Sequence, residues 1–299
     1  MTTQDLYPTR LGQEVKMLER HDPVVWGSGE GSALTAAQVE SYECDGYLQL
    51  PALFSESEVE AFQEEIAKLT SDRELLASER VIIEPDEDSL ALRSVFDVHR
   101  EGMFRDLVRD ERVSNVARQL LGSDVYIHQS RINLKPPFRG KEFFWHSDFE
   151  TWHAEDGMPS MRALSASVSL TENVHSNGPL MVIPGSHKHF VACGGETPAE
   201  HHRESLRRQE IGVPSDEMLT RLADESEVRN LVGPIGSVTF FDCNLMHGSN
   251  GNITPQARRN VFFVYNSVHN TLVEPFAAPA RRPNHIAARN FEAVPLPVG

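Results

Sequence analysis

Two side chains that commonly bind metal ions, His146 and Asp148, are separated by a single residue and directly follow the aromatic segment 143–145. Side chains two positions apart on a β-strand project from the same face. A strand through this segment would therefore direct an imidazole and a carboxylate into one pocket, with the aromatic residues packing the strand in place. A lone His-x-Asp pair is a weak motif, so a metal site here depends on a third ligand.

The third candidate ligand is His247, which follows the apolar stretch 236–246 and precedes Gly248 and Ser249. A His-x-Asp pair followed much later by a histidine is the order of the two-histidine, one-carboxylate facial triad, which leaves open coordination positions on Fe(II). Such a site suits a metal that must also bind a co-substrate and oxygen. Zinc accepts the same ligand types, so the ligands alone leave the identity of the metal open.

A basic pair, Arg258 and Arg259, stands shortly after His247 and leads into the apolar stretch 261–265. Because alternate strand residues face opposite sides, one arginine is expected to point into the fold and the other outward. A buried arginine is unfavourable unless it meets an anion, and its planar fork matches a carboxylate. Lys135, on an earlier predicted strand, offers a second positive group for a dicarboxylate.

The elements that must position these residues change along the chain from helices to strands. Helices are predicted at 35–46, where Thr35 and Gln38 form a capping-box pattern, and at 56–69 and 103–121. Beyond Gly122 the pattern becomes short strands with Gly and Pro turns, at 125–134, 143–149, 163–170, 180–183, 237–241 and 261–265. We expect a mainly β fold, an antiparallel barrel or jelly roll with flanking helices, as a single domain over residues 1–299. Residues 1–31 read as an N-terminal arm, and the polar stretch 191–229 as a lid or an excursion that carries a short helix.

Composition and charge exclude several classes of partner. The chain has 28 Lys and Arg residues and 44 Asp and Glu residues, and its formal net charge is −16. This balance opposes binding to nucleic acid or to an anionic membrane. The chain has no apolar run long enough to span a bilayer and no signal-peptide core near its start. Its three cysteines are widely scattered, so neither a disulfide framework nor a zinc knuckle is indicated, and a cytoplasmic location is the expectation.

Together these segments resemble a known family. The pair His146-x-Asp148, the run 178–188, the His247-Gly-Ser triplet and the arginine pair are similar to the phytanoyl-CoA dioxygenase-like Fe(II)/2-oxoglutarate oxygenases. The nineteen-residue run 144–162 resembles the signature of the ectoine hydroxylases within that family. The resemblance extends over nearly the whole chain.

The resemblance implies a double-stranded β-helix fold, a homodimer and the cofactors Fe(II), 2-oxoglutarate and O2. The implied reaction converts ectoine to 5-hydroxyectoine, with succinate and CO2 as the other products, under osmotic or heat stress. Carried over by position, the iron ligands are His146, Asp148 and His247. The 2-oxoglutarate positions are Lys135, Phe143, Ser249 and Arg258, because position relative to His247 favours Arg258 over Arg259. The ectoine positions are Gln129, Trp152, Asn260 and Phe262.

Residue chemistry agrees with these positions. Ectoine carries a cationic amidinium ring, which suits the faces of Trp152 and Phe262, and a carboxylate. Arg131 lies two residues beyond Gln129 on the same predicted strand and is a candidate partner for that carboxylate, as are the arginines at 281 and 282. Strand alternation is expected to turn His128 away from the pocket, and the acids at 155 and 156 read as loop residues beside a turn.

Two alternatives remain at this level. The same fold and triad could hydroxylate another small amino-acid-like or acyl substrate. A protein of a different class, a metal-free barrel that only binds a ligand, is the second alternative, and it would leave Asp148 and Arg258 without an evident role.

Overall fold

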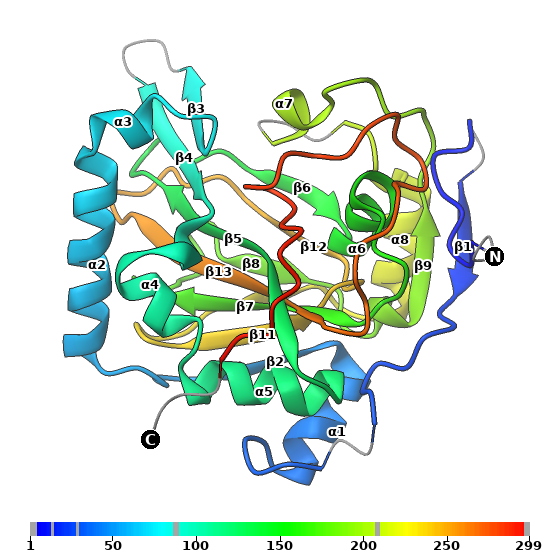
Figure 1. Ribbon diagram of the computed structural model, residues 1–299, viewed down its shortest axis with the longest axis horizontal. Helices are drawn as coiled ribbons and strands as arrows, with labels where there is room; N and C mark the ends of the chain where they lie inside the picture. Colours follow the sequence, from blue (N-terminus) through cyan, green and yellow to red (C-terminus); the bar gives the residue numbers. More distant parts are fainter. Residues whose placement is uncertain (1–4, 13–14, 28–29, 86–89, 207–209, 296–299) are drawn as a thin grey trace.

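Two antiparallel β-sheets form the centre of the protein in the computed structural model, which describes residues 5–12, 15–27, 30–85, 90–206 and 210–295. The larger sheet has the strand order β2-β11-β7-β13-β5-β4-β3 and the smaller one β10-β8-β12-β6, while β1 and β9 form a separate pair. Figure 1 labels most of these strands. The aromatic ring of Phe241 in the larger sheet lies 5.0 Å from the ring of His247 in the smaller one, so the two sheets face each other. The predicted mainly β jelly roll with flanking helices is confirmed.

The strands are β1 (Lys16–Glu19), β2 (Tyr47–Leu50), β3 (Val81–Pro85), β4 (Leu90–Phe96), β5 (Val125–Lys135), β6 (Phe143–His146), β7 (Ala163–Ser169), β8 (Leu180–Val182), β9 (His189–Ala192), β10 (Arg229–Leu231), β11 (Val238–Asp242), β12 (His247–Ser249) and β13 (Arg258–Ser267). The helices are α1 (Ala36–Asp45), α2 (Glu56–Ser71), α3 (Arg73–Leu76), η1 (Val98–Arg100), α4 (Gly102–Leu107), α5 (Glu111–Leu121), α6 (Asp148–Thr151), η2 (Trp152–Asp156), η3 (Ser186–Lys188), α7 (His202–Ser205) and α8 (Asp216–Glu225).

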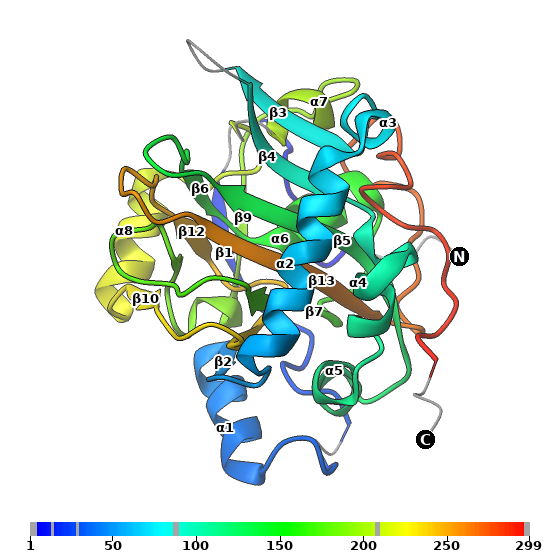
Figure 2. The same ribbon diagram turned by 90° about the vertical axis from the view of Figure 1, so that its left-hand side faces the viewer.

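The helices before β5 cover the outer face of the larger sheet, where α2 lies across the strands (Figure 2). Both α1 and α2 begin with a capping box, Thr35 with Gln38 in α1 and Ser55 with Glu58 in α2, which satisfies backbone N–H groups at the helix start. Apolar side chains of these helices, such as Phe62, pack with the outward side chains of the sheet in one hydrophobic core. Residues from both halves of the chain share this core, because β2 pairs with β11.

Strict alternation in β7 separates a hydrophobic outer face from a polar inner one. Leu164, Ala166 and Val168 belong to the core under the helices, and the serines between them, Ser165 and Ser167, face the interior between the sheets. A strand buried on both sides usually carries apolar residues throughout. Inward serines therefore mark a polar cavity rather than a second hydrophobic core.

Two predicted elements end earlier than expected. The helix predicted at 103–121 is divided into α4 and α5, because the Asp110 side chain accepts a hydrogen bond from the Arg112 N–H and caps a new helix. The strand predicted at 143–149 ends at His146, and Asp148 begins α6 instead. The two candidate ligands thus reach the same place by a strand end and a helix start, not by strand alternation.

A β-bulge in β5 breaks alternation at His128. Gln129 pairs with Val264 and Ile127 with Tyr265, so residue 128 has no partner of its own on β13. An extra residue of this kind redirects the side chains around it. The expectation that His128 turns away from the pocket is wrong: its ring lies 5.1 Å from the ring of Trp152.

The predicted arm and excursion are partly built into the fold. In the arm, β1 pairs with β9, and in the excursion, Leu222 of α8 packs in a hydrophobic cluster with Met246, so the expected short helix is present. Residues 1–4, 13–14 and 28–29 of the arm and 207–209 of the excursion lie outside the described residues. Whether the excursion acts as a lid stays a prediction. None of the helices in the described part of the chain has the length and apolar character needed to cross a membrane.

Candidate metal centre and its pocket

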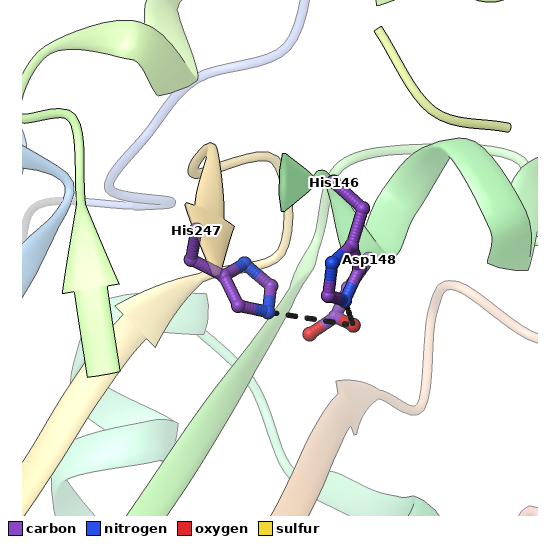
Figure 3. A group of neighbouring side chains, drawn as sticks. All are labelled: His146, Asp148 and His247. Carbon is purple, nitrogen blue, oxygen red and sulfur yellow. Dashed lines mark ion pairs between the residues drawn. The ribbon is translucent and has the colours of Figure 1, made fainter. Parts of the chain in front are cut away.

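The side chains of His146, Asp148 and His247 converge between the two sheets (Figure 3). His146 ends β6 and His247 begins β12, and the two residues are direct partners across these neighbouring strands. Asp148 Oδ1 lies 3.7 Å from His146 Nε2 and 4.0 Å from His247 Nε2. The three ligand atoms all lie within 4.8 Å of one another. Among the described residues this is the only group of three or more histidine, cysteine or acidic side chains with such a geometry.

Hydrogen bonds to the backbone fix how both imidazoles present themselves. His146 Nδ1 lies 2.7 Å from the carbonyl oxygen of Phe144, and His247 Nδ1 lies 2.9 Å from that of Leu245. A carbonyl only accepts, so each Nδ1 carries the proton and each Nε2 has a free lone pair. Burial and the neighbouring His247 lower the pKa of His146 to about 4. The ring is therefore neutral at physiological pH, as a metal ligand must be.

Two neighbouring hydrogen bonds hold the carboxylate and connect the ligand segments. Ser165 Oγ, on the inner face of β7, donates to Asp148 Oδ2 at 3.4 Å. Ser147 Oγ donates to Asn244 Oδ1 at 3.0 Å, which links the segment of His146 and Asp148 to the turn before His247. Sequence reasoning missed Ser147 and Asn244, because 97 residues separate them and no local pattern pairs them.

A buried cationic group, Arg258, lies at the start of β13 beside the end of β5. Arg258 is only 2 % exposed, whereas Arg259 is exposed, so the prediction that one arginine points inward is confirmed. Arg258 donates to the Gly178 carbonyl and to Asn133 Oδ1, its Nε has no partner, and no carboxylate pairs with it in the described part of the chain. Burial, Arg131 and Arg93 lower its pKa to about 9. An unpaired buried guanidinium of this kind is a site for an anion.

The other predicted 2-oxoglutarate residues surround this arginine. Lys135, the strand partner of Arg258, is 1 % exposed and donates from Nζ to Ser249 Oγ at 2.7 Å. The ring of Phe143 lies 5.3 Å from the same Nζ. The structure therefore brings Lys135, Phe143, Ser249 and Arg258 together.

Sequence reasoning missed a further cation, Arg93. Its guanidinium carbon lies 3.7 Å above the ring of Phe143, and its NH2 donates to the carbonyl of Glu142 at 3.1 Å. No motif marks this residue, since it comes from β4, which joins the sheet through β5. It adds to the positive potential around Arg258 and fixes the ring of Phe143.

The predicted substrate residues line the inner face of β5 and β13 beside the metal centre. Arg131 lies with its guanidinium carbon 5.2 Å from the ring centre of Phe262, and no carboxylate pairs with it among the described residues. Asn260 donates from Nδ2 to Ser167 Oγ at 3.0 Å, while its Oδ1 has no partner. Gln129 donates from Nε2 to the Ile286 carbonyl at 2.8 Å.

Trp152 is separated from this row. It is buried in η2 and packs in a cluster with Phe149 and Val264, and Val264 is the strand partner of Gln129.

The arginines considered at 281 and 282 have partners already. Arg281 pairs with Glu274 on the surface, and Arg282 makes a two-point ion pair with Asp156. The expectation that Glu155 and Asp156 are loop acids is wrong. Both are buried in η2, where arginines from the two ends of the chain neutralise them.

The arrangement fits a metal with open coordination positions and an anionic co-substrate. Two imidazoles and one carboxylate converge from one side, as in the facial triad that binds Fe(II). Arg258 and Lys135 supply buried positive charge for a dicarboxylate, and Arg131 offers a further cation. Asn260 Oδ1 and Arg258 Nε are buried polar atoms without partners, and such atoms usually mark the position of a ligand.

Comparison with known proteins gives a consistent picture. The family model "Phytanoyl-CoA dioxygenase (PhyH)" matches residues 42–260. The ectoine dioxygenase of Streptomyces avermitilis is 54% identical over 295 residues, 98% of this chain and 99% of that protein. The ectoine dioxygenase of Bordetella bronchiseptica is 53% identical over 294 residues, 97% of this chain and 95% of that protein.

Solved structures agree with these relatives. The crystal structure of EctD from S. alaskensis with bound Fe superimposes with a TM-score of 0.87 at 44% identity, covering 99% of both chains. The structure of the same protein with 2-oxoglutarate and 5-hydroxyectoine gives a TM-score of 0.86 at 45% identity, covering 97% of both chains.

Proposed function

Because the chain belongs to the phytanoyl-CoA dioxygenase family, we propose that it hydroxylates ectoine to 5-hydroxyectoine and couples this step to the oxidative decarboxylation of 2-oxoglutarate to succinate and CO2. The observation that carries the proposal is the convergence of His146, Asp148 and His247 beside a buried arginine, Arg258, that has no carboxylate partner among the described residues. Full-length relatives named ectoine dioxygenase support the choice of substrate.

In this proposal His146 Nε2, His247 Nε2 and Asp148 Oδ1 hold Fe(II). Ferrous iron, together with 2-oxoglutarate and O2, supplies the oxidising power that places a hydroxyl group on an unactivated carbon. The protein residues hold the metal on one side only. Hydrogen bonds from both Nδ1 atoms keep the imidazoles in the required tautomer, and Ser165 restrains the carboxylate.

Arg258 is the proposed partner of the distal carboxylate of 2-oxoglutarate. Its unpaired Nε and planar fork suit two parallel hydrogen bonds to a carboxylate. Lys135 and Ser249, which already touch each other, would share this anion, and the ring of Phe143 would cover it. Binding would therefore give the buried charge of Arg258 the counter-ion that it lacks.

Ectoine would lie along the inner face of β5 and β13, between the metal and the C-terminal segment. We assign its carboxylate to Arg131, because no carboxylate of the described chain pairs with this cation. Asn260 and Gln129 would hydrogen-bond the molecule without adding charge, and the faces of Trp152 and Phe262 suit its cationic ring, at roughly 0.5–2 kcal/mol for each cation–π contact. The faces and amides are buried, at Gln129, Trp152, Asn260 and Phe262, which would keep water from the reacting carbon.

We further propose that the protein works in the cytoplasm as a single-domain chain that forms a homodimer, with no nucleic-acid or membrane partner. Its net charge of −16 supports the absence of polyanionic partners, and a hydrophobic core shared by both halves of the chain supports a single domain. The dimer is inferred from the family alone, and sedimentation at micromolar concentration tests it.

Anaerobic reconstitution with Fe(II) and 2-oxoglutarate tests the chemistry. We expect the charge-transfer absorption of the iron–2-oxoglutarate complex, a change of that band on adding ectoine, and equimolar succinate and 5-hydroxyectoine once oxygen enters. Arg258→Met should abolish the band at moderate 2-oxoglutarate concentration, and Arg259→Met on the outer face is the matched control. No ectoine-dependent succinate would contradict the substrate, and no charge-transfer band would contradict the cofactors.

A further inference from the structure

The short helical segment formed by α6 and η2 carries more than Asp148 and Trp152. Three of its other side chains, Glu150, Glu155 and Asp156, are carboxylates that are at most 2 % exposed. Buried carboxylates are strongly unfavourable unless they are paired and hydrogen-bonded. The segment that supplies Asp148 and Trp152 is therefore held in place by ion pairs. The arginines of these pairs come from distant parts of the chain.

The N-terminal arm binds the segment at Glu150 and Glu155. Arg10 makes a two-point ion pair with Glu150, at 2.9 Å and 2.7 Å, and a second ion pair with Glu155 at 2.6 Å. Thr9 Oγ1 donates to Glu150 Oε1, and His201 Nδ1 lies 2.9 Å from Glu155 Oε1. None of the described bonds of Arg10 reaches Trp152 or His128, although Glu155 also lies 4.0 Å from Arg282 Nε.

The C-terminal segment, which runs past α6 in Figure 1, binds the segment at Asp156. Arg282 donates from Nε and NH2 to the two oxygens of Asp156, at 2.7 Å and 2.6 Å. Burial raises the pKa of Asp156, but the charge and hydrogen bonds of Arg282 outweigh this and leave the pKa at about 2. The pair is therefore ionised across the whole physiological range.

Asp156 connects this ion pair, through His128, to Trp152. Its Oδ2 lies 3.1 Å from His128 Nε2, and the imidazole packs edge-on against Trp152, with ring centres 5.1 Å apart at 67°. The other ring nitrogen of His128 is buried without a partner. The ionised carboxylate only accepts, so His128 Nε2 donates this bond and the carboxylate fixes the orientation of the ring.

The same C-terminal segment also reaches the substrate side of β5. The Ala288 N–H donates to the His128 carbonyl at 2.8 Å, and Gln129 donates to the Ile286 carbonyl at 2.8 Å. The bulge at residue 128 is thus bonded to the segment through both its backbone and its neighbour. Displacing residues 282–288 would move Gln129 and Trp152 together.

We propose that Arg282, Asp156 and His128 form a positioning relay that fastens the C-terminal segment over the substrate pocket and sets Trp152 and Gln129. These residues act through others, since the charge of Arg282 is paired with Asp156 at 2.6 Å and with Glu155 at 4.0 Å. The inference rests on the proposed function, because it concerns the ectoine side of that site. The relay touches neither the described metal ligands nor Arg258, so its loss should affect ectoine and leave iron and 2-oxoglutarate binding intact.

The test compares Arg282→Met, Arg282→Lys and Asp156→Asn with wild type in the full chain reconstituted with Fe(II). We expect the KM for ectoine to rise about tenfold in Arg282→Met, since misplacement by about 1 Å can lower rates by up to about a hundredfold. We also expect succinate to exceed 5-hydroxyectoine, because a loosely held substrate is not hydroxylated in every turnover. The charge-transfer band with 2-oxoglutarate should keep its wild-type midpoint, and Arg282→Lys should restore part of the KM.

Arg10→Met is the matched control, since it breaks equally buried ion pairs on the same segment but leaves His128 untouched. It should lower the unfolding temperature without changing the KM or the product ratio of the folded protein. The double variant Arg282→Met, Asp156→Asn should have a KM no worse than the single Arg282→Met variant, because both act through one pair.

The outcomes separate the relay from the function on which it rests. Wild type that makes no 5-hydroxyectoine overturns the proposed function. Active wild type together with an unchanged KM and product ratio in both Arg282→Met and Asp156→Asn overturns the relay, as does an equal change in Arg10→Met. If Arg282→Met fails to fold, Asp156→Asn and Arg282→Lys carry the same comparison, and an unchanged KM in both overturns the relay.

Discussion

Replacing Arg258 with methionine should make the metal-free, ligand-free protein more stable while abolishing 2-oxoglutarate binding. Methionine has a similar length and no charge. Most buried arginines belong to ion pairs, and removing one of these leaves an uncompensated carboxylate, which is strongly destabilising. Arg258 differs, because no carboxylate of the described chain pairs with it and its Nε has no partner.

The magnitude follows from the charge that the fold must hold. Burial and the nearby cations Arg131 and Arg93 lower the pKa of Arg258 to about 9, from the ordinary arginine value of about 12.5. At about 1.4 kcal/mol per pKa unit this corresponds to about 5 kcal/mol of destabilisation while the group is charged. Methionine would leave the Gly178 carbonyl and Asn133 Oδ1 without this donor, at about 1–2 kcal/mol each. The net expectation is a gain of about 2 kcal/mol at neutral pH.

The stability difference between Arg258→Met and wild type depends on pH. A cation whose folded pKa is lowered destabilises the fold at every pH below that value. The penalty is relieved as the pH rises above about 9, where Arg258 can lose its proton in the folded protein. The stability advantage of Arg258→Met should therefore shrink at alkaline pH.

Urea unfolding of the EDTA-treated protein measures the free energy of unfolding without ligands. The same experiment with Fe(II) and 2-oxoglutarate under nitrogen measures the free energy of unfolding of the bound protein. A ligand at a hundred times its Kd stabilises a protein by about 2.7 kcal/mol, and only wild type should gain this from 2-oxoglutarate. Arg259→Met, exposed on the same strand, should change neither free energy. A loss of more than about 1 kcal/mol in apo Arg258→Met would refute the reasoning, since the charge would then be compensated without ligand.

Three further predictions concern the metal centre and the buried acids. Asp148→Ala should lower iron affinity at least about tenfold by removing one of three ligands, and an anaerobic iron titration that matches wild type would contradict its role. Ser147→Ala removes the bond to Asn244 and should weaken iron binding about tenfold, while the free energy of unfolding changes by only about 1 kcal/mol. Iron titration and urea unfolding measure the two effects. Unchanged iron affinity together with a larger loss of stability would mean that the bond is structural only. The pKa of Asp156 and that of Glu155 are both about 2 in the folded protein and near 4 when unfolded, so their stabilisation is complete above about pH 4 and disappears as the pH falls to about 2. Urea midpoints that do not fall over this range, or that fall equally in Asp156→Asn, would contradict this account.

The candidate metal ligands and the basic pair were predictable because their signals are local. The order His146, Asp148, His247 and a following arginine is visible in the chain, and alternation limits the inward position to one of Arg258 and Arg259. The two capping boxes also depend on residues three positions apart, and both are present as the sequence indicates.

Errors arose where the local rule was interrupted. The bulge at His128 inserts one residue into β5, and its energy depends on the partner strand, which the sequence does not specify. Asp110 caps a new helix inside a stretch that reads as one continuous helix. In both cases a single residue changes the direction of the chain, and periodicity averaged over a segment does not detect it.

The sequence by itself determined the chemistry of this protein, because metal ligands, carboxylate partners and the polar or apolar face of a strand are properties of residue types at short spacing. Only the tertiary structure decided how the charges of distant segments are used. Arg282 and Asp156 lie 126 positions apart, and Arg10 and Glu150 lie 140 apart; in the sequence each is one charged residue among many. Burial turns them into ion pairs, because a charge removed from water is stable only beside its opposite, and burial is a property of the whole fold.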